Sequence, residues 1–550
     1  MDDFCTLKQL LINSAQLYKN NTAFYLKDKG KAIYKVTYEK FKLDCDCLGT
    51  ALLYDLDAKD KNIGVYMSNC YEWCVSYLAV VAGVGTVVPL DKELSAAELE
   101  NIITFAEIET IITDSEHFEV LRRIPSYDKL KIITSTEMSD EGVFNFASLL
   151  SKGEKLLGEG KDIYLSTETY PEQISTLLFT SGTTGMTKGV MLSNNNICSD
   201  ILAVGKVINL KDNDVSLSVL PLHHTYESIA FLMLISRGAA ISFSDGFRRL
   251  RENFAEYRPT IFVTVPLILE NLHKRIISKI DSQGKGNRAR LITRVSSVIP
   301  FESRKKIFSD IHSSFGGRLR FIICGAAALQ KSTAKDFMSY GIPVIMGYGL
   351  TECSPIVICN SENEPTVDSV GKPLDGVQIK IVNPDENGIG EIAVKGPMVM
   401  KGYYKNKQQT DKVMLNGWFH TGDLGFVDKN GNYHITGRSK NVIVTAGGKN
   451  VYPEEVEYYL SKEGVIRECM VYCEGDDIIS VEILPDTENI KKKIHKNILS
   501  DDEIHSAVKE AVRNVNKTLP AYKRIRKVNI RKEEFNKTST HKIKRKNHFI

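Results

Sequence analysis

Short runs of β-branched residues alternate with helix-like patterns along residues 60–350, and this alternation limits the possible folds more than any other feature of the chain. Strands that alternate with helices are typical of parallel βαβ units. We therefore expect α/β subdomains up to about residue 359. The runs that predict strands are IGVYMSN, TVVPLD, TIITD, KIITS, STLLFTSG, VSLSVLPL, AAISFSD, TIFVTVPL, LRFIICG and PVIMGYG.

The pattern changes after residue 359. Turn signals such as Asn383-Pro384-Asp385 separate short strands in residues 360–437, which predicts a small antiparallel β unit. Helices are then expected at 453–462 and 502–516, with strands between them. The expected fold is thus α/β: a large N-terminal domain, 1–437, of two α/β subdomains plus the β unit, followed by a smaller, mobile α+β C-terminal domain, 438–550.

The composition is that of an ordinary globular protein. The chain has 550 residues, of which 43% are hydrophobic and 25% charged, and about 150 residues per domain predicts three to four structural units. The formal net charge of +3 gives no overall attraction to nucleic acid or to an anionic membrane. Residues 521–550 are the basic part, with eleven Lys or Arg, two Glu and a net charge of +9.

Neither a targeting signal nor a membrane span is expected. The N-terminus lacks a basic segment followed by an apolar run. The longest apolar stretch, Val75 to Leu90, has 16 residues, fewer than the roughly 20 that span a bilayer; it predicts a core helix that leads into a strand. The eleven cysteines lack CxxC spacing, which favours reduced, mostly buried thiols in a cytoplasmic protein.

The segment 177–190 is the most informative motif. An apolar strand leads into three glycines, four hydroxyl side chains and one lysine, which together supply the backbone N–H groups and the cation that bind phosphate. It is not a Walker A loop, since no Gly-Lys in the chain precedes Ser or Thr. A Gly/Ser/Thr loop alone is more often only a loop. The candidate phosphate-binding residues are Ser181, Gly182, Thr183, Thr184, Gly185 and Lys188.

Two further motifs support a nucleotide site. Thr351 and Glu352 follow an apolar run and place a hydroxyl beside a carboxylate, a pair suited to phosphate and Mg²⁺. Asp423 is expected to follow a tight turn, as carboxylates that hold ribose hydroxyls do. Each fragment alone more often marks only a strand that ends in a turn, for Thr351 and Glu352, or a hairpin with an Asp cap, for Asp423.

Seven motifs, in order, resemble the adenylate-forming (AMP-binding) superfamily of acyl-CoA synthetases, adenylation domains and luciferases. The resemblance covers nearly the whole chain and is strongest to the long-chain fatty acyl-CoA synthetase-like branch. The motifs are TSGTTGMTKG (180–189), LPLHHTYE (220–227), CGAAAL (324–329), GYGLTE (347–352), GWFHTGDLG (417–425), GRSKNVIVTAGGKNVYPEEVE (437–457) and KTSTHKIKR (537–545). Thr187 replaces the family's usual Pro, and His541 replaces a common Gly.

The resemblance implies a role for each matching residue. Lys542, Thr351, Glu352 and His224 would be catalytic, with Thr183 and Glu352 near Mg²⁺ and His224 at the acyl carboxylate; a core histidine is the other interpretation of His224, and His223 is expected to be structural. Lys440 would be the hinge, and Gly447 and Gly448 would border the CoA channel. The remaining residues implied for nucleotide binding are Gly325, Ala326, Ala327, Tyr348, Asp423 and Arg438.

The implied activity is ATP-dependent acyl-CoA synthesis through an acyl-AMP intermediate, with fatty acid, ATP, Mg²⁺ and CoA as reactants and cofactor. The basic tail leaves acyl carrier protein open as another thiol acceptor. A non-catalytic nucleotide sensor and an RNA-binding tail are alternatives from other classes. The sensor would be expected to lack Lys542, Glu352 or Asp423, which are all present, and the tail lacks the interleaved aromatic residues of an RNA platform. The sequence does not decide between a monomer and an oligomer, or for or against peripheral contact with a membrane.

Overall fold

The computed structural model describes residues 4–27, 32–136, 140, 142–180, 188–282, 299–362, 365–444, 450–474, 478–537, 543 and 545. The chain divides into two compact units. The first comprises Met1–Gln378 with Val394–Phe419, and the second comprises Ile379–Ala393 with His420–Ile550. The domain boundary expected at residues 437/438 stays a prediction.

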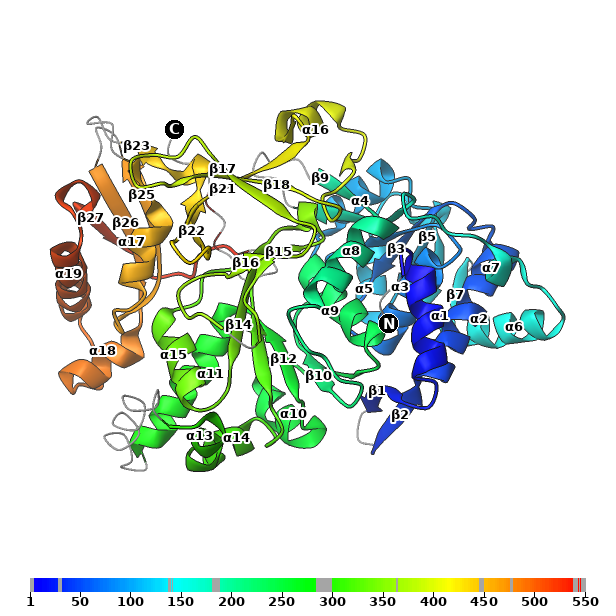
Figure 1. The fold of residues 1–550 in the computed structure, drawn as a ribbon, viewed down its shortest axis with the longest axis horizontal. Coiled ribbons are helices and arrows are strands. Elements are labelled where there is room, and N and C mark those ends of the chain that lie inside the picture. The colour runs from blue at the N-terminus through cyan, green and yellow to red at the C-terminus, as the bar shows by residue number, and fades with distance from the viewer. Residues whose placement is uncertain are drawn as a thin grey trace. The chain divides into compact units, whose positions relative to one another are not determined.

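One large sheet of the first unit is parallel in its centre and antiparallel at both edges (Figure 1). Three central parallel strands, Val215–Ser218, Ile261–Thr264 and Phe321–Cys324, are buried along their length, as β-branched runs covered on both faces should be. In spatial order the nine strands are β16 (Lys372–Pro373), β15 (Ile356–Cys359), β14 (Val344–Gly349), β13 (Phe321–Cys324), β12 (Ile261–Thr264), β10 (Val215–Ser218), β11 (Ala240–Phe243), β1 (Thr22–Lys27) and β2 (Ile33–Thr37).

The second large sheet is also parallel in its centre but is antiparallel at one edge only. Its strands run parallel from β8 to β7, and two antiparallel strands complete the other edge. In spatial order the eight strands are β19 (Gly402–Tyr403), β9 (Lys188–Ser193), β8 (Ile174–Thr180), β4 (Thr86–Pro89), β3 (Asn62–Tyr66), β5 (Thr110–Thr113), β6 (Lys131–Thr134) and β7 (Val143–Asn145).

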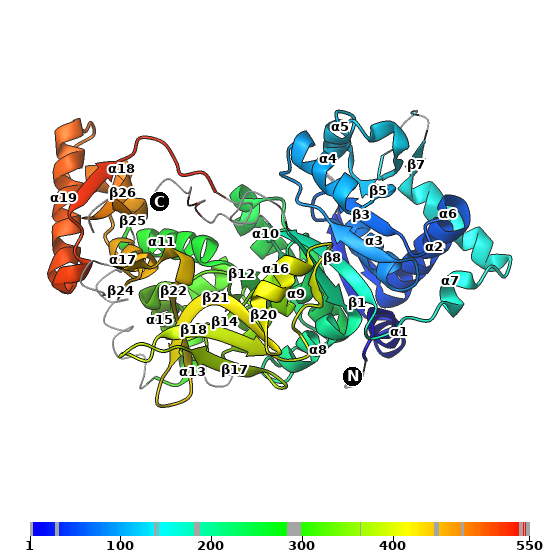
Figure 2. The same cartoon turned by 90° about the horizontal axis from the view of Figure 1, so that it is seen from above.

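Helices cover both large sheets, and Figure 2 shows them on either side of the strands. They are α1 (Leu7–Leu17), α2 (Tyr38–Leu56), α3 (Tyr71–Val81), α4 (Ala96–Phe105), α5 (Ser115–Leu121), α6 (Phe146–Gly158), α7 (Ile163–Ser166), α8 (Asn194–Val204), α9 (Thr225–Ser236), α10 (Leu250–Tyr257), α11 (Pro266–Ser282), α13 (Phe301–Ile307), α14 (Ser309–Ser314), α15 (Lys331–Ser339) and α16 (Lys407–Val413). The apolar stretch 75–90 forms α3 and β4, as predicted. Within the described ranges, we find no helix with the length and apolarity needed to cross a bilayer.

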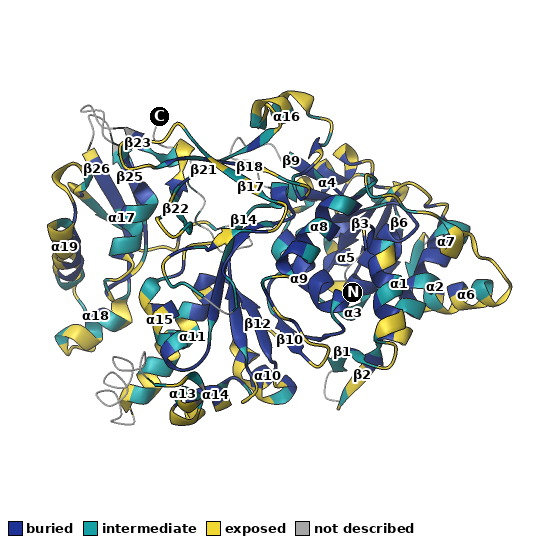
Figure 3. Ribbon diagram, viewed as in Figure 1, coloured by how far each residue is buried: buried dark blue, intermediate teal, exposed yellow. Residues whose placement is uncertain are grey.

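The cores of these sheets are aliphatic. In the sheet with eight strands, α4 and α5 pack on one face through residues such as Leu99 and Phe118, which meet strand residues such as Tyr66, Val88 and Ile111. Figure 3 shows the central strands of both sheets buried and the exposed surface concentrated on helices such as α6 and α16. Two parallel, helix-covered sheets confirm the predicted α/β class.

Residues 360–437 do not all belong to one small antiparallel β unit, as had been expected. β20 (Met414–Leu415) and β22 (Tyr433–Arg438) pair antiparallel with β21 (Trp418–Val427), in a sheet with β17 (Gln378–Val382) and β18 (Gly390–Lys395). Two segments of 360–437, however, join the large sheets instead, as β16 and β19. Each has only two residues, too few to show the alternation that identifies a strand in sequence.

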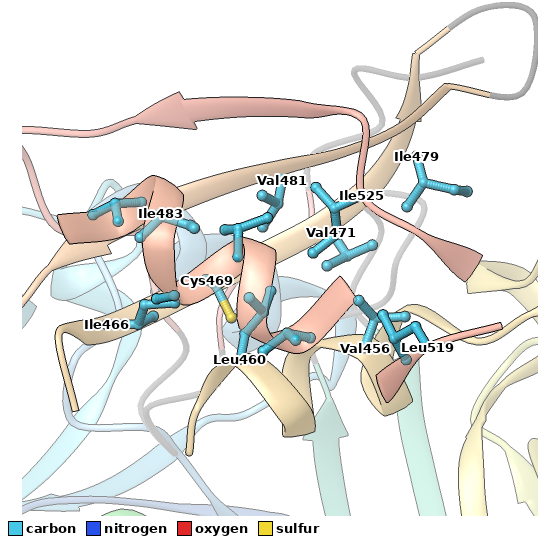
Figure 4. Packing of buried hydrophobic residues seen from close by; sticks show 14 of the residues in the cluster. Val456, Leu460, Ile466, Cys469, Val471, Ile479, Val481, Ile483, Leu519 and Ile525 are labelled. Atoms are coloured by element: carbon cyan, nitrogen blue, oxygen red, sulfur yellow. The ribbon is translucent and has the colours of Figure 1, made fainter. Parts of the chain in front are cut away.

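The C-terminal elements form an α+β arrangement with its own core. β25 (Ile466–Glu474) and β26 (Ile478–Pro485) are antiparallel, and β27 (Lys527–Ile530) lies parallel to β26. Valine and isoleucine side chains of these strands pack against Val456, Leu460 and Leu519 (Figure 4). The other elements are β23 (Ile443–Val444), β24 (Asn450–Val451), α17 (Pro453–Leu460), α18 (Thr487–Ile494) and α19 (Asp501–Thr518). α17 and α19 confirm the helices predicted here.

Candidate functional site

The predicted phosphate loop connects two paired strands. Thr180 at the end of β8 lies opposite Lys188 at the start of β9. The residues between them include Ser181, Gly182, Thr183, Thr184 and Gly185, and these lie outside the described residues. Lys188 is half-buried, and its Nζ atom lies 4.8 Å from the centre of the Tyr403 ring. The one described member of the predicted phosphate set is therefore a lysine held against an aromatic face.

Tyr403 also binds the carboxylate predicted for Mg²⁺. Its hydroxyl donates a 2.9 Å hydrogen bond to Oε1 of Glu352. Tyr403 is 5% exposed, and burial, together with the Glu352 carboxylate, raises the pKa of its hydroxyl well above the usual range. The tyrosine therefore stays a hydrogen-bond donor at neutral pH, and one side chain joins Lys188 to Glu352.

Thr351 and Glu352 lie where β14 ends, in a short 3₁₀ turn, Thr351–Cys353. Tyr348, the predicted adenine-site residue, lies on β14 opposite Ile358. Oγ1 of Thr225, the first residue of α9, donates a 3.0 Å hydrogen bond to Oγ1 of Thr351. The turn is thus tied to α9 on one side and, through Tyr403, to β19 on the other.

His224 is the N-cap residue of α9, and the backbone N–H groups of Glu227 and Ser228 donate to its carbonyl oxygen. His224 is half-buried, whereas His223 is buried. Because α9 also carries Thr225, the fold brings His224, the predicted acyl-carboxylate residue, close in sequence and space to the Thr225–Thr351 contact. The N-terminal end of α9 therefore positions His224, which is its N-cap residue, and also Thr351, through the hydrogen bond of Thr225.

A buried carboxyl group supports this helix end. Ser218 Oγ donates a 2.5 Å hydrogen bond to Oε1 of Glu227, and Asn69 Nδ2 lies 3.2 Å from the same serine oxygen. Complete burial raises the pKa of Glu227 to about 8, and the Ser218 hydrogen bond only partly opposes that shift. Glu227 is therefore mostly protonated at neutral pH.

The CGAAAL segment follows β13. Gly325 is buried, and a Cβ placed on it would lie 3.2 Å from the Tyr226 ring, so a larger side chain would press on that ring. Ala326 has a φ of 68°, and both Ala326 and Ala327 are exposed. Small residues thus leave the carboxyl end of β13 open, as a predicted adenine-binding surface requires.

In the second unit, the two predicted ribose-binding residues lie on paired strands. Asp423 on β21 is opposite Arg438 on β22, and Arg438 Nε lies 2.8 Å from Oδ1 of Asp423. The expected turn before Asp423 is wrong: residues 418–427 form one strand, in which Gly422 alone takes a φ of 70°. Lys440 lies in a 3₁₀ turn, Ser439–Asn441, directly after Arg438.

The predicted residues Lys542, Gly447 and Gly448 lie outside the described residues. The described residues around Lys542 are anchored. Arg545 makes hydrogen bonds of 2.6 and 2.5 Å to the two carboxylate oxygens of Glu457 and one of 3.0 Å to the carbonyl oxygen of Val471. Lys537 forms an ion pair with Glu468 and a β-bridge with Ile543.

Two residues that the sequence analysis missed hold the site together. Tyr403 contacts both Lys188 and Glu352, and Thr225 contacts Thr351. Nothing in the sequence distinguishes Tyr403 from its neighbour Tyr404, whose hydroxyl instead lies 3.5 Å from Glu107 on an exposed surface. Thr225 could have been noticed, because it follows the two histidines within the LPLHHTYE motif.

Within the first unit, the site offers a cation, a carboxylate and hydroxyl groups at the ends of β9, β14 and α9. Carboxyl ends of parallel strands are the usual binding edge of an α/β sheet. A lysine beside a carboxylate and a threonine can hold a phosphate chain together with a hard divalent cation.

The comparisons with known proteins agree with this arrangement. The sequence profile of the AMP-binding enzyme family matches residues 11–404, and that of the AMP-binding enzyme C-terminal domain matches residues 440–549. The chain is 31% identical to long chain acyl-CoA synthetase 5 of Arabidopsis thaliana, over 80% of this chain and 72% of that protein. It is 28% identical to the peroxisomal long chain acyl-CoA synthetase 7 of the same plant, over 86% of this chain and 73% of that protein.

A solved structure shares the fold. An anthranilate CoA ligase in complex with anthranoyl-AMP superposes with a TM-score of 0.78 at 22% identity, covering 98% of this chain and 95% of that one. The predicted fold class and family are therefore both confirmed. The chain belongs to the AMP-binding enzyme family, in its long-chain acyl-CoA synthetase-like branch.

Proposed function

We propose that this protein is an ATP-dependent fatty acyl-CoA synthetase, an AMP-forming acid–thiol ligase. One observation carries the proposal: Tyr403 holds a half-buried lysine against its ring and a carboxylate at its hydroxyl, from motifs about 160 residues apart. Within a family of AMP-binding enzymes, this arrangement suits Mg-ATP. The relatives named as long chain acyl-CoA synthetases favour a fatty acid as the acid substrate.

In the first half-reaction, a carboxylate oxygen of the fatty acid attacks the α-phosphorus of ATP. The bond between that phosphorus and the bridging oxygen breaks, pyrophosphate leaves and acyl-AMP remains. Lys188 and the Ser181–Gly185 segment would bind the phosphates, Thr351 the α-phosphate, and His224 the acyl carboxylate. Lys542 would stabilise the charge that builds up as two anions approach.

Thr183 and Glu352 would hold Mg²⁺. The donor set fits, since carboxylate and hydroxyl oxygens are the ligands this hard cation prefers, and the Tyr403 hydrogen bond occupies only Oε1 of Glu352. When bound, Mg²⁺ would neutralise charge on the leaving pyrophosphate. Tyr348, Gly325, Ala326 and Ala327 would line the adenine site, and Asp423, oriented by Arg438, would bind the ribose.

In the second half-reaction, the CoA sulfur attacks the acyl carbonyl carbon, the bond to the AMP oxygen breaks and the thiol proton is lost to solvent. Lys440 would serve as the hinge at which the C-terminal domain, residues 438–550, turns between the two half-reactions. Gly447 and Gly448 would leave room for the pantetheine arm of CoA. We place the protein in the cytoplasm, although two similar plant proteins are named as peroxisomal.

The test is pyrophosphate release with acids from C2 to C18 and with aryl acids. Medium to long fatty acids should be far better substrates than acetate, because each buried CH₂ contributes about 0.8 kcal/mol. Thioester formation is then measured with CoA and with acyl carrier protein. A preference for acetate or an aryl acid would reject the fatty acid while keeping the adenylating activity. Absence of pyrophosphate release with every acid would reject the proposed function.

A further inference from the structure

Three side chains that can bind a metal ion meet beside the start of α9. Asp91 follows the carboxyl end of β4, and His223 and His224 directly precede α9. One donor atom from each residue lies within 4.8 Å of the other two, and this is the one such group found among the described residues. Two imidazoles and a carboxylate therefore converge at one edge of the fold.

His223 is in an unusual position for a buried histidine. It is 7% exposed, and its Nε2 atom finds no hydrogen-bond partner in the described part of the chain. That atom nevertheless lies 3.2 Å from Oδ1 of Asp91. A buried ring nitrogen left without a hydrogen bond costs free energy, so this atom is well placed to accept a different partner.

We propose that Asp91, His223 and His224 form a binding site for a borderline transition-metal ion of the Zn²⁺ class. Zinc binds imidazole nitrogen and carboxylate oxygen at about 2.0 to 2.2 Å. Two ligands of a tetrahedral ion at that distance lie about 3.3 to 3.6 Å apart. The His223–Asp91 pair already has nearly this separation, and a donor atom of His224 lies within 4.8 Å of both of them.

The second histidine separates this cluster from histidine–carboxylate pairs such as His117–Asp114 and His273–Asp336. His117 lies 2.5 Å from Asp114 and His273 lies 3.0 Å from Asp336. Neither pair has a second imidazole within reach among the described residues. One imidazole and one carboxylate give too few ligands for a site that usually has three or four. The pair of His117 and Asp114 is therefore a natural matched control.

A metal ion bound by Asp91, His223 and His224 would inhibit the proposed reaction. This consequence rests on the proposed function, in which His224 binds the acyl carboxylate. A metal ion that uses His224 as a ligand removes that contact, so it should act as an inhibitor that competes with the fatty acid. Mg²⁺ prefers oxygen ligands and would not replace zinc at two imidazoles.

Direct binding tests the site without reference to activity. The full-length protein is freed of metal with a chelator and titrated with Co²⁺ alone, whose visible absorption reports imidazole and carboxylate ligands, and then with Zn²⁺ as a competitor. The wild type should bind one Co²⁺ with no thiolate absorption. Asp91→Asn and His223→Gln should each bind at least tenfold more weakly, whereas His117→Gln should bind as the wild type does.

Thermal unfolding of each variant and the variant Asp91→Glu separate ligation from misfolding. Asp91→Glu keeps a carboxylate and should retain most of the affinity. Unchanged Co²⁺ binding in Asp91→Asn and His223→Gln would overturn the proposal, as would a thiolate spectrum in the wild type. So would equal weakening in Asp91→Glu and Asp91→Asn, because that result would mean the carboxylate is not a ligand.

Kinetics test the consequence. Zn²⁺ should raise the apparent KM for fatty acid without lowering the maximal rate of pyrophosphate release, and His223→Gln should be at least tenfold less sensitive to it. Inhibition that fatty acid cannot relieve would contradict the link to His224. If the wild type, freed of transition metal and supplied with Mg²⁺, released no pyrophosphate with any acid, the proposed function would fail while the Co²⁺ titration still decided the metal site.

Discussion

The hydroxyl of Tyr403 donates to Oε1 of Glu352 across 2.9 Å, although the two residues are 51 positions apart in the chain. Because this hydrogen bond engages Oε1, the other carboxylate oxygen of Glu352 is the one that points away from the tyrosine. Because the ring of Tyr403 also lies against Lys188, its two interactions can be separated by substitution.

We expect Tyr403→Phe to raise the Mg²⁺ concentration needed for half-maximal pyrophosphate release about tenfold, since it removes a hydrogen bond to a charged group. The phenyl ring keeps its contact with Lys188, so the KM for ATP should change little. Tyr403→Leu should raise both values. Tyr404→Phe, which alters the neighbouring hydroxyl, is the control and should behave as the wild type; identical Mg²⁺ profiles for Tyr403→Phe and Tyr404→Phe would contradict the assignment.

The buried carboxyl of Glu227 should make stability depend on pH. Burial raises its pKa from 4.5 to about 8 in the folded state, so between these values the folded protein holds a proton that the unfolded chain releases. The stabilising contribution is complete below pH 4.5 and is lost as pH rises through 8. Relative to Glu227→Gln, the free energy of unfolding of the wild type should fall by about 1.4 kcal/mol per pH unit.

Denaturant unfolding of both proteins between pH 5.5 and 7.5 measures this slope. Glu227→Gln is a suitable reference because Ser218 Oγ can donate to the amide oxygen as it does to the carboxyl group. Parallel pH curves for the two proteins would mean that Glu227 titrates normally in the fold.

The anchor that follows Lys542 should contribute to stability. Nη2 of Arg545 contacts both carboxylate oxygens of Glu457, and the two side chains are 28% and 19% exposed. Among the described residues, Arg545→Met would leave the Glu457 carboxylate with the Val471 N–H as its hydrogen-bond donor, so we expect the free energy of unfolding to fall by about 2 to 3 kcal/mol. Arg467→Met breaks the exposed Arg467–Glu534 pair and should cost less than about 1 kcal/mol; similar losses in the two variants would refute the special role of Arg545.

The two half-reactions should respond to different substitutions. Lys542→Ala should slow acyl-AMP formation about 10²-fold or more, by loss of a charge-stabilising donor, yet convert supplied acyl-AMP to thioester at the normal rate. Gly448→Leu should form acyl-AMP normally and fail at thiol transfer, because its side chain would fill the channel. Lys544→Ala is the neighbouring control. Equal loss of both half-reactions in Lys542→Ala and Gly448→Leu would rule out alternating domain positions.

The helices and strands that could be predicted from the sequence are those with a clear apolar pattern. β12, β13 and β14 lie where β-branched runs predicted them, because strands buried on both faces need continuous apolar residues. β16 and β19 have two residues each and no such pattern. The expected turn before Asp423 failed because one glycine with positive φ fits within a long strand.

The residues of the candidate site also divide into those that could be predicted from the sequence and those that could not. Thr351, Glu352 and Lys188 could be predicted, since a carboxylate, hydroxyl and lysine after apolar strands indicate phosphate and metal chemistry. Tyr403 could not, because its importance comes from a contact between distant segments and not from its own neighbours in sequence. His223, expected to be structural, is buried, and its approach to Asp91 required the three-dimensional fold.

The pairing of β19 with β9 also sets the order in which this site can be completed as the chain is made. Lys188 is synthesised 215 residues before Tyr403, a delay of about 10 to 40 s at typical rates of translation. During that interval β9 has an unpaired edge, with neither its last partner strand nor the tyrosine in place. A nascent chain shorter than about 400 residues therefore cannot assemble the lysine–tyrosine–carboxylate contact, so the proposed nucleotide site would still lack the tyrosine that orients Glu352.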